Sequence, residues 1–214
     1  MVEKFLEIAK SKIGCGYVYG SQGQIMTQTL LNSLIKTFGK SHYEFTDSQG
    51  AVRADKWIGK QSFDCSGLVV WILQQIGVLK ANQDYTAAGL YNSLCEPVTK
   101  DKLVPGDLVF IRPANGVINH VGIFIGNGKT IEAIGTRKGV VQGDASRFNV
   151  YGRLKVFKNE IEKLTSNKEM TFEQALEIIA EKADTVYQYW LKRKDIDPAF
   201  SALIIKIAKS CGGK

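Results

Sequence analysis

Histidine and cysteine are scarce in this chain of 214 residues, which contains only two histidines and four cysteines. The cysteines are widely spaced and form no C-x-x-C pair, so the sequence predicts neither a disulfide framework nor a cysteine–histidine zinc site. At this chain length, such cysteine usage is typical of free thiols in a reducing compartment. We therefore expect no bound metal.

Long apolar runs are also missing. Apolar stretches such as Leu68 to Leu73 are far too short to span a membrane. The first ten residues carry acidic and basic side chains where a secretory signal would be apolar. The sequence gives no visible export route, so we expect synthesis in the cytoplasm.

Acidic residues are outnumbered by basic ones, 21 against 28, which gives a formal net charge of +7. This excess favours a polyanionic partner such as nucleic acid, an anionic membrane or an anionic wall polymer. It is not gathered into one run and therefore identifies no partner. The overall composition, 44% hydrophobic and 23% charged, is that of a globular protein and excludes a disordered one.

The hydrophobic pattern predicts helices first and strands afterwards. Apolar residues at helical spacing predict an amphipathic helix near 2–13, a short helix over 29–38 and a buried helix over 68–76. Strands are predicted over the ranges 107–111, 120–125, 129–133 and 151–157. This order is typical of an α+β domain rather than of repeated βαβ units.

A change of composition after Phe157 predicts two parts, a main domain over 1–157 and a tail over 158–214. The main domain contains an irregular insert at about 21–62. The tail has helix-starting signals, among them a capping box at Thr171, and we expect it to be helical over 171–208. It is too short to bury a large core alone, so it should dock on the main domain or on a partner.

Cys65 occupies the position best suited to chemistry, because it directly precedes the buried helix. A thiol there meets unpaired N–H groups and the positive end of the helix dipole, which favours the thiolate. A backbone N–H at the same place can stabilise an oxyanion. A free cysteine is otherwise usually a small buried apolar residue, so the chemical interpretation needs a base. His120 opens a predicted strand and is the candidate, whereas His42 lies in the insert and is most simply a surface residue.

Four sequence blocks resemble those of the NlpC-type cell-wall peptidases and occur in the family's order. They are 14–20, 63–69, 103–110 and 119–128, and together they cover roughly residues 1–157. The resemblance implies a compact papain-like α+β fold that works without a cofactor. It also implies hydrolysis of amide bonds in peptidoglycan stem peptides, commonly the bond between D-γ-glutamate and a diamino acid. By position, Cys65 is then the nucleophile and His120 the base.

The resemblance extends to residues around this pair. Tyr17 resembles the tyrosine whose hydroxyl lies beside the thiol, although a core aromatic remains the alternative. Asp64 and Ser66 flank the nucleophile and are candidates for substrate binding or the oxyanion hole. The third catalytic position falls on Glu132, where the family commonly has histidine, asparagine or glutamine. A carboxylate can still accept the imidazole N–H, but a strand glutamate usually faces solvent.

The turn after the 120–125 strand decides whether Glu132 can reach His120, because side chains alternate between the two faces of a sheet. A plain two-residue turn at Asn127 would put the two side chains on opposite faces. We predict a three-residue connection over 126–128, with Ile125 paired to Lys129 and a left-handed residue at Gly128. That register brings a Glu132 oxygen within hydrogen-bonding distance of the His120 ring.

The sequence thus predicts a cysteine endopeptidase that binds bacterial peptidoglycan and no nucleic acid. The tail resembles those of clostridial phage and prophage wall hydrolases, which favours a lysin or virion tail component that reaches the wall after release by a holin or by lysis. An intracellular muropeptide-recycling peptidase, a catalytically silent wall-binding module and an acyl transferase remain alternatives. The stem-peptide bond, the tail's partner and the role of the insert (lid, subsite wall or surface embellishment) stay open.

Overall fold

The computed structural model describes residues 1–114, 116–166, 174, 177 and 202–206. The chain divides into two units, Met1–Glu160 and Ile161–Lys214. The predicted tail helix over 171–208 lies outside the described residues, apart from 174, 177 and 202–206. The predicted domain boundary after Phe157 stays a prediction. Every site residue predicted from the sequence lies in the first unit.

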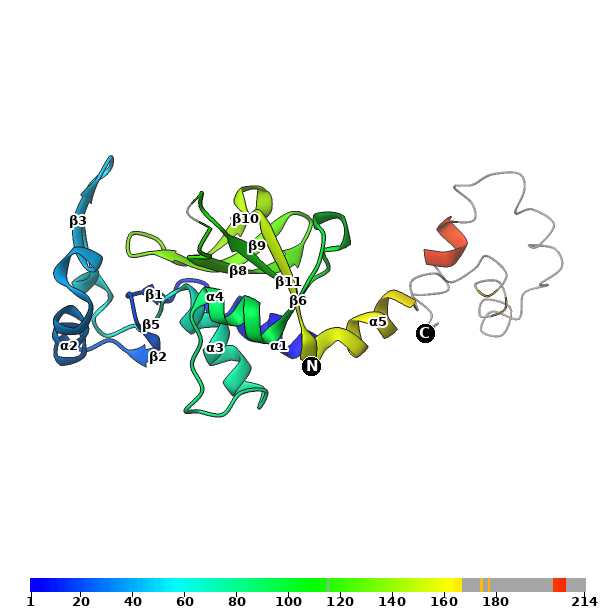
Figure 1. Ribbon diagram of the computed structural model, residues 1–214, viewed down its shortest axis with the longest axis horizontal. Helices are drawn as coiled ribbons and strands as arrows, with labels where there is room; N and C mark the ends of the chain where they lie inside the picture. Colours follow the sequence, from blue (N-terminus) through cyan, green and yellow to red (C-terminus); the bar gives the residue numbers. More distant parts are fainter. Residues whose placement is uncertain (115, 167–173, 175–176, 178–201, 207–214) are drawn as a thin grey trace. The chain divides into compact units, whose positions relative to one another are not determined.

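The first unit is α+β, as the order of its elements predicts (Figure 1). The helices of the described residues are α1 (Val2–Ser11), α2 (Gln28–Phe38), α3 (Cys65–Gln75), α4 (Ala87–Gly89) and α5 (Lys158–Ser166), which continues past the end of the first unit. None of the helices in the described part of the chain combines the length and apolar character that a membrane span requires.

The main sheet has six antiparallel strands in the order β10-β9-β8-β7-β11-β6. Their bounds are Gly139–Asp144 for β10, Lys129–Gly135 for β9, His120–Gly126 for β8, Leu108–Ile111 for β7, Val150–Leu154 for β11 and Cys95–Pro97 for β6. A second sheet, β1-β5-β2, consists of Gly16–Tyr17, Gln61–Phe63 and Gln22–Ile25. The predicted strand over 151–157 ends early, since its last three residues form a short 3₁₀ helix.

Helix α3 lies at the centre of the unit, where it packs against β8 and β9. Its sequence is apolar almost all round, and five of its side chains are buried: Leu68, Val69, Val70, Ile72 and Leu73. Burying each such side chain contributes about 1.5–3 kcal/mol. The helix therefore holds its first residue, Cys65, rigidly against the sheet.

The connection between β8 and β9 differs from the predicted one. Asn127 and Gly128 both have positive φ, 50° and 68°, which is the two-residue turn that an Asn-Gly pair favours. Gly126 pairs with Lys129, so the predicted pair between Ile125 and Lys129 is wrong. Instead, Ile125 is the extra residue of a bulge inside β8, next to a left-handed Gly126 with φ 92°.

The bulge has the same effect on register as the predicted turn. Beyond it, Phe124 pairs with Thr130 and Ile123 with Ile131. Continued along the strands, this register sets His120 level with Ile134, as predicted. The side chains of His120 and Glu132 therefore lie on the same face of the sheet.

The insert at 21–62 contains the predicted short helix, which is α2, and also a hairpin of β3 (Glu44–Asp47) and β4 (Gly50–Arg53) that its irregular pattern did not predict. Its core includes the buried side chains of Met26, Leu31, Tyr43, Ala54 and Trp57. Trp57 Nε1 donates a hydrogen bond to the Thr136 carbonyl oxygen at 2.7 Å. Arg137 forms an ion pair with Asp47 at 2.6 Å. The β9–β10 turn is thus fastened to the insert.

We predict that Trp57→Ala destabilises the unit by about 3–5 kcal/mol, because it leaves a cavity in the insert core and an unpaired Thr136 carbonyl. Equilibrium unfolding in urea measures the change. Phe45→Ala is the matched control, since Phe45 is 42% exposed on the hairpin and should cost less than about 1 kcal/mol. Equal losses in the two variants would contradict the assigned role of Trp57.

Candidate active site

Cys65 is the first residue of α3, and Asp64 caps the helix. One Asp64 carboxylate oxygen accepts the Gly67 N–H at 2.7 Å and the Ser66 hydroxyl at 3.1 Å, and the other accepts the Gly20 N–H at 2.9 Å. These bonds fix the start of the helix and the loop beside it. In the structure, Asp64 and Ser66 are therefore engaged in holding the nucleophile's backbone.

The Cys65 thiol does not have the lowered pKa that its helix position predicts. Desolvation of the thiol, together with the neighbouring Asp64 carboxylate, raises the pKa of Cys65 to about 12. The backbone N–H of Val121 on β8 and those at the helix end lower the pKa of Cys65, but burial outweighs them. The thiol lies 4.0 Å from the Asn119 carbonyl oxygen, to which it donates a weak hydrogen bond. At neutral pH the resting group is a thiol, so its activation needs a base.

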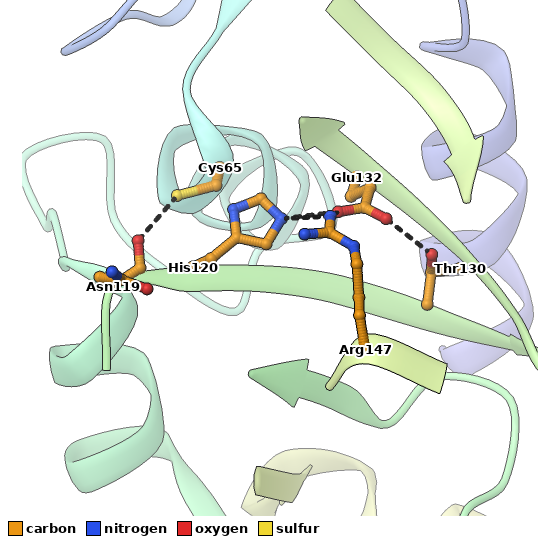
Figure 2. Close-up of polar contacts among 6 residues, drawn as sticks. All are labelled: Cys65, Asn119, His120, Thr130, Glu132 and Arg147. Carbon is orange, nitrogen blue, oxygen red and sulfur yellow. Dashed lines mark hydrogen bonds and ion pairs between the residues drawn. The ribbon is translucent and has the colours of Figure 1, made fainter. Parts of the chain in front are cut away.

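His120 lies between Cys65 and Glu132 (Figure 2). Its Nε2 is 2.6 Å from Glu132 Oε2, which is the hydrogen bond that the register argument predicts. Its Nδ1 is on the Cys65 side of the ring. With Nε2–H donated to the carboxylate, Nδ1 is the nitrogen that can accept a proton. The imidazole also stacks on Phe148, with ring centroids 5.8 Å apart.

Glu132 is fully buried rather than solvent-facing. Its Oε1 accepts the Thr130 hydroxyl at 3.1 Å. Two glycines make room around it: a Cβ at Gly143 would come within 2.2 Å of Oε1, and a Cβ at Gly122 within 3.4 Å of the Glu132 Cβ. Neither glycine was identified from the sequence, nor was Thr130. Thr130 could have been predicted, because side chains two residues apart on a strand lie on the same face and Thr130 is two residues before Glu132.

Arg147 is a further residue of the site that sequence reasoning missed. It belongs to the short 3₁₀ helix Ala145–Arg147, which follows β10. Its Nη2 donates a hydrogen bond to Glu132 Oε2 and lies 3.2 Å from His120 Nε2. The guanidinium is 4.8 Å from the centroid of the Phe148 ring. No sequence pattern connects Arg147 to the histidine, because only the fold of β10 and its 3₁₀ helix brings it there.

Cys65 and His120 open onto a cleft of about 580 Å³. Tyr17 and Tyr19 line it from the N-terminal segment, and Phe38 lines it from the insert. The insert thus contributes to the wall of the cleft. Val117 and Ile118, just before β8, also line the cleft.

Tyr17 is positioned by backbone pairing, since β1 aligns it with Phe63, two residues before Cys65. Burial and the nearby Cys65 thiol raise the pKa of Tyr17, so its hydroxyl stays protonated and can donate to a bound group. Tyr17 lines the cleft and is therefore not solely a residue of the core. Among the residues that the structure describes, no three His, Cys, Asp or Glu side chains gather in a way that could hold a metal ion.

We predict that His120→Ala slows alkylation of Cys65 by iodoacetamide at pH 7.5 at least about tenfold, because a thiol of raised pKa loses its proton acceptor. Mass spectrometry of the labelled peptides measures the rate. The internal control is Cys15, whose pKa is raised chiefly by its own burial and whose rate should not change. An unchanged alkylation rate of Cys65 would show that His120 does not accept the proton of the thiol.

Comparison with known proteins gives a consistent result. The model of the NlpC/P60 family matches residues 42–158. Murein DD-endopeptidase MepH of Escherichia coli is 31% identical over 115 residues, 51% of this chain and 37% of that protein. Peptidoglycan endopeptidase RipA of Mycolicibacterium smegmatis is 29% identical over 79 residues, 37% of this chain and 15% of that protein. The matched part of the chain therefore spans about a third of MepH and less of RipA.

A search of solved structures finds chains that are similar to this one. The peptidoglycan hydrolase RipB of Mycobacterium tuberculosis has a TM-score of 0.47 and 24% identity over 71% of this chain and 63% of that one. The family match covers more than half of the 214 residues and includes both Cys65 and His120. The chain belongs to the NlpC/P60 family.

Proposed function

We propose that this protein is a cysteine endopeptidase that hydrolyses amide bonds in the stem peptides of bacterial peptidoglycan. The observation that carries the proposal is the array of Cys65, His120 and Glu132, of which Cys65 and His120 line a cleft and Glu132 is buried behind the imidazole. A nucleophile, a base and a group that orients the base are the parts that acyl transfer needs. The substrate class is supported by the family and by relatives named for murein and peptidoglycan endopeptidases.

In the first half of the reaction, His120 Nδ1 takes the thiol proton while Cys65 Sγ attacks the amide carbonyl carbon. The negative charge moves to the carbonyl oxygen, near the first N–H groups of α3, with the protonated Tyr17 hydroxyl as a further donor. The imidazolium, held by Glu132, then gives its proton to the leaving amine. The amide bond breaks and a thioester on Cys65 remains.

In the second half, water replaces the amine. His120, neutral again, takes a proton from the water as its oxygen attacks the thioester carbon. The intermediate collapses, the carboxylic acid leaves, and the proton returns to the Cys65 sulfur. Glu132 keeps Nε2–H oriented toward itself throughout, so that Nδ1 always faces the reacting atoms.

The bond that is cut has two candidates. The family resemblance favours the bond between D-γ-glutamate and the diamino acid, which is our first choice. The name of the relative MepH, a DD-endopeptidase, favours a bond between two D-configured centres in the cross-link. The two choices release fragments of different mass from the same sacculi.

We further propose that the protein is a phage or prophage lysin or a tail-associated wall hydrolase, which acts on the wall after release. The resemblance of its tail to those of clostridial phage and prophage hydrolases supports this context. The alternative is a peptidase that recycles muropeptides inside the cell. A lysin should release fragments from intact sacculi, whereas a recycling enzyme should cut only soluble fragments.

We predict that the full chain releases stem-peptide fragments from purified sacculi and that Cys65→Ala abolishes the release while the fold is retained. Mass spectrometry of the soluble products, with sacculi of several peptidoglycan types, identifies the bond. Circular dichroism of both proteins controls for folding. Product formation by Cys65→Ala at the parent rate, or no product from any sacculus or muropeptide, would refute the proposed function.

Glu132 variants test the third catalytic position. Glu132→Gln should lose about tenfold in kcat/KM, because an amide oxygen still accepts from Nε2, whereas Glu132→Ala should lose on the order of 10²- to 10³-fold. Steady-state hydrolysis of a muropeptide measures both. Glu3→Gln, on the exposed face of α1, is the matched control and should keep parental activity. Equal activity of the alanine and glutamine variants would leave Cys65 and His120 as a dyad.

A further inference from the structure

The buried negative charge of Glu132 requires a nearby group that is always positively charged. The carboxylate is fully buried, and burying a charge without an opposite one is costly. The Thr130 hydroxyl is neutral. In the proposed reaction His120 is positively charged only while it holds the proton taken from the thiol or from the water, so it cannot balance Glu132 in the resting state. Arg147 carries a positive charge at every relevant pH.

We propose that Arg147 is a positioning residue: it is the permanent counter-ion of Glu132, and it keeps His120 uncharged at neutral pH so that the imidazole can accept the Cys65 proton. This inference rests on the proposed function for its catalytic consequence. The counter-ion role itself concerns the folded protein and can be measured without a substrate.

The geometry supports this role because two donors converge on one oxygen. Glu132 Oε2 accepts both His120 Nε2 and Arg147 Nη2, and the two nitrogens are 3.2 Å apart. With the guanidinium in place, a proton added to the imidazole would bring a second positive charge to the same oxygen. Without it, the buried carboxylate would have the imidazole as its cationic partner and would stabilise the protonated ring.

The Phe148 ring packs against both the imidazole and the guanidinium. Phe148 stacks under the His120 ring and lies 4.8 Å from the Arg147 guanidinium. The Arg147 side chain is 40% exposed, so solvent screens part of its effect. The other ionisable groups that contact the imidazole or line its cleft in the described residues are Cys65 and Asp64 at the start of α3, Glu132 on β9, Tyr17, Tyr19, Asp84 and Tyr85. None of these groups carries a fixed positive charge, whereas Arg147 does.

The consequence for catalysis follows from the state of the nucleophile. Since burial raises the pKa of Cys65, the thiol must pass its proton to His120. A ring that is already protonated cannot accept it, and it cannot activate water for the second half-reaction. Removing Arg147 should therefore slow the enzyme most at the acidic end of its range and least at alkaline pH.

The test is an NMR titration of the histidine ring protons in the full chain, where only His42 and His120 contribute and His42→Asn assigns them. Arg147→Met should raise the midpoint of the His120 transition by at least about one pH unit. Arg147→Lys, which keeps the charge, should stay near the parent. The control is Arg137→Met, which removes an arginine–carboxylate pair with Asp47 and should leave the midpoint unchanged. An unchanged or lowered midpoint in Arg147→Met would overturn the proposal.

Thermal unfolding provides a second measurement, which tests the counter-ion role even if Arg147→Met is too unstable for the titration. Arg147→Met should lower Tm by at least about 5 °C because it leaves a buried charge unpaired. In the double variant Glu132→Gln/Arg147→Met both charges are absent, and most of the lost Tm should return. A double variant no more stable than Arg147→Met would overturn the counter-ion role.

The pH profile of muropeptide hydrolysis tests whether the change in the His120 titration also changes catalysis. The acidic limb of kcat/KM should move to higher pH in Arg147→Met by the same amount as the NMR midpoint, with KM little changed because Arg147 is not among the residues that line the cleft. An unmoved acidic limb would overturn the catalytic part of the proposal. If the parent cleaves no muropeptide, the proposed function fails, while the titration and the Tm series still decide the counter-ion role.

Discussion

The catalytic arrangement depends on a single extra residue in one strand. The bulge at Ile125 shifts the pairing of β8 with β9 by one position. Without that shift, His120 and Glu132 would point to opposite faces of the sheet, since side chains alternate. With it, the imidazole and the carboxylate are hydrogen-bonded at 2.6 Å. Helix α3 packs against the same two strands, and its first residue, Cys65, lies beside the imidazole (Figure 2).

Burial then determines the electrostatics of the site. It raises the pKa of the Cys65 thiol, so the nucleophile rests uncharged and depends on its base. It also encloses Glu132, which makes a permanent cation at Arg147 valuable. The result is a row of groups, Cys65, His120, Glu132 and Arg147, in which each group sets the charge state of the next. At rest the charges of Glu132 and Arg147 cancel, and Cys65 and His120 are neutral. One proton can then move from the thiol to the imidazole without leaving a buried charge unpaired.

Much of the fold was predictable because its signals are local. The apolar run of α3 and the apolar strands β8 and β9 each depend on neighbouring residues in the chain. In the insert the helix α2 was predicted but the hairpin was not, because the insert is held by contacts with distant partners, such as that between Trp57 and Thr136. The predicted turn was wrong in detail, since Asn-Gly keeps its two-residue geometry and the strand absorbs the extra residue.

The sequence by itself determined the α+β class and the candidates Cys65 and His120, because residue type and position in the hydrophobic pattern carry that information, whereas Glu132 followed from the resemblance to the NlpC-type peptidases. Only the tertiary structure decided the protonation state of the thiol, which depends on how deeply it is buried. Only the structure brought in Arg147, Phe148 and the two glycines around Glu132, because contacts across strands leave no trace in the local pattern. Local sequence sets which groups are available, and long-range packing sets their distances and their charges.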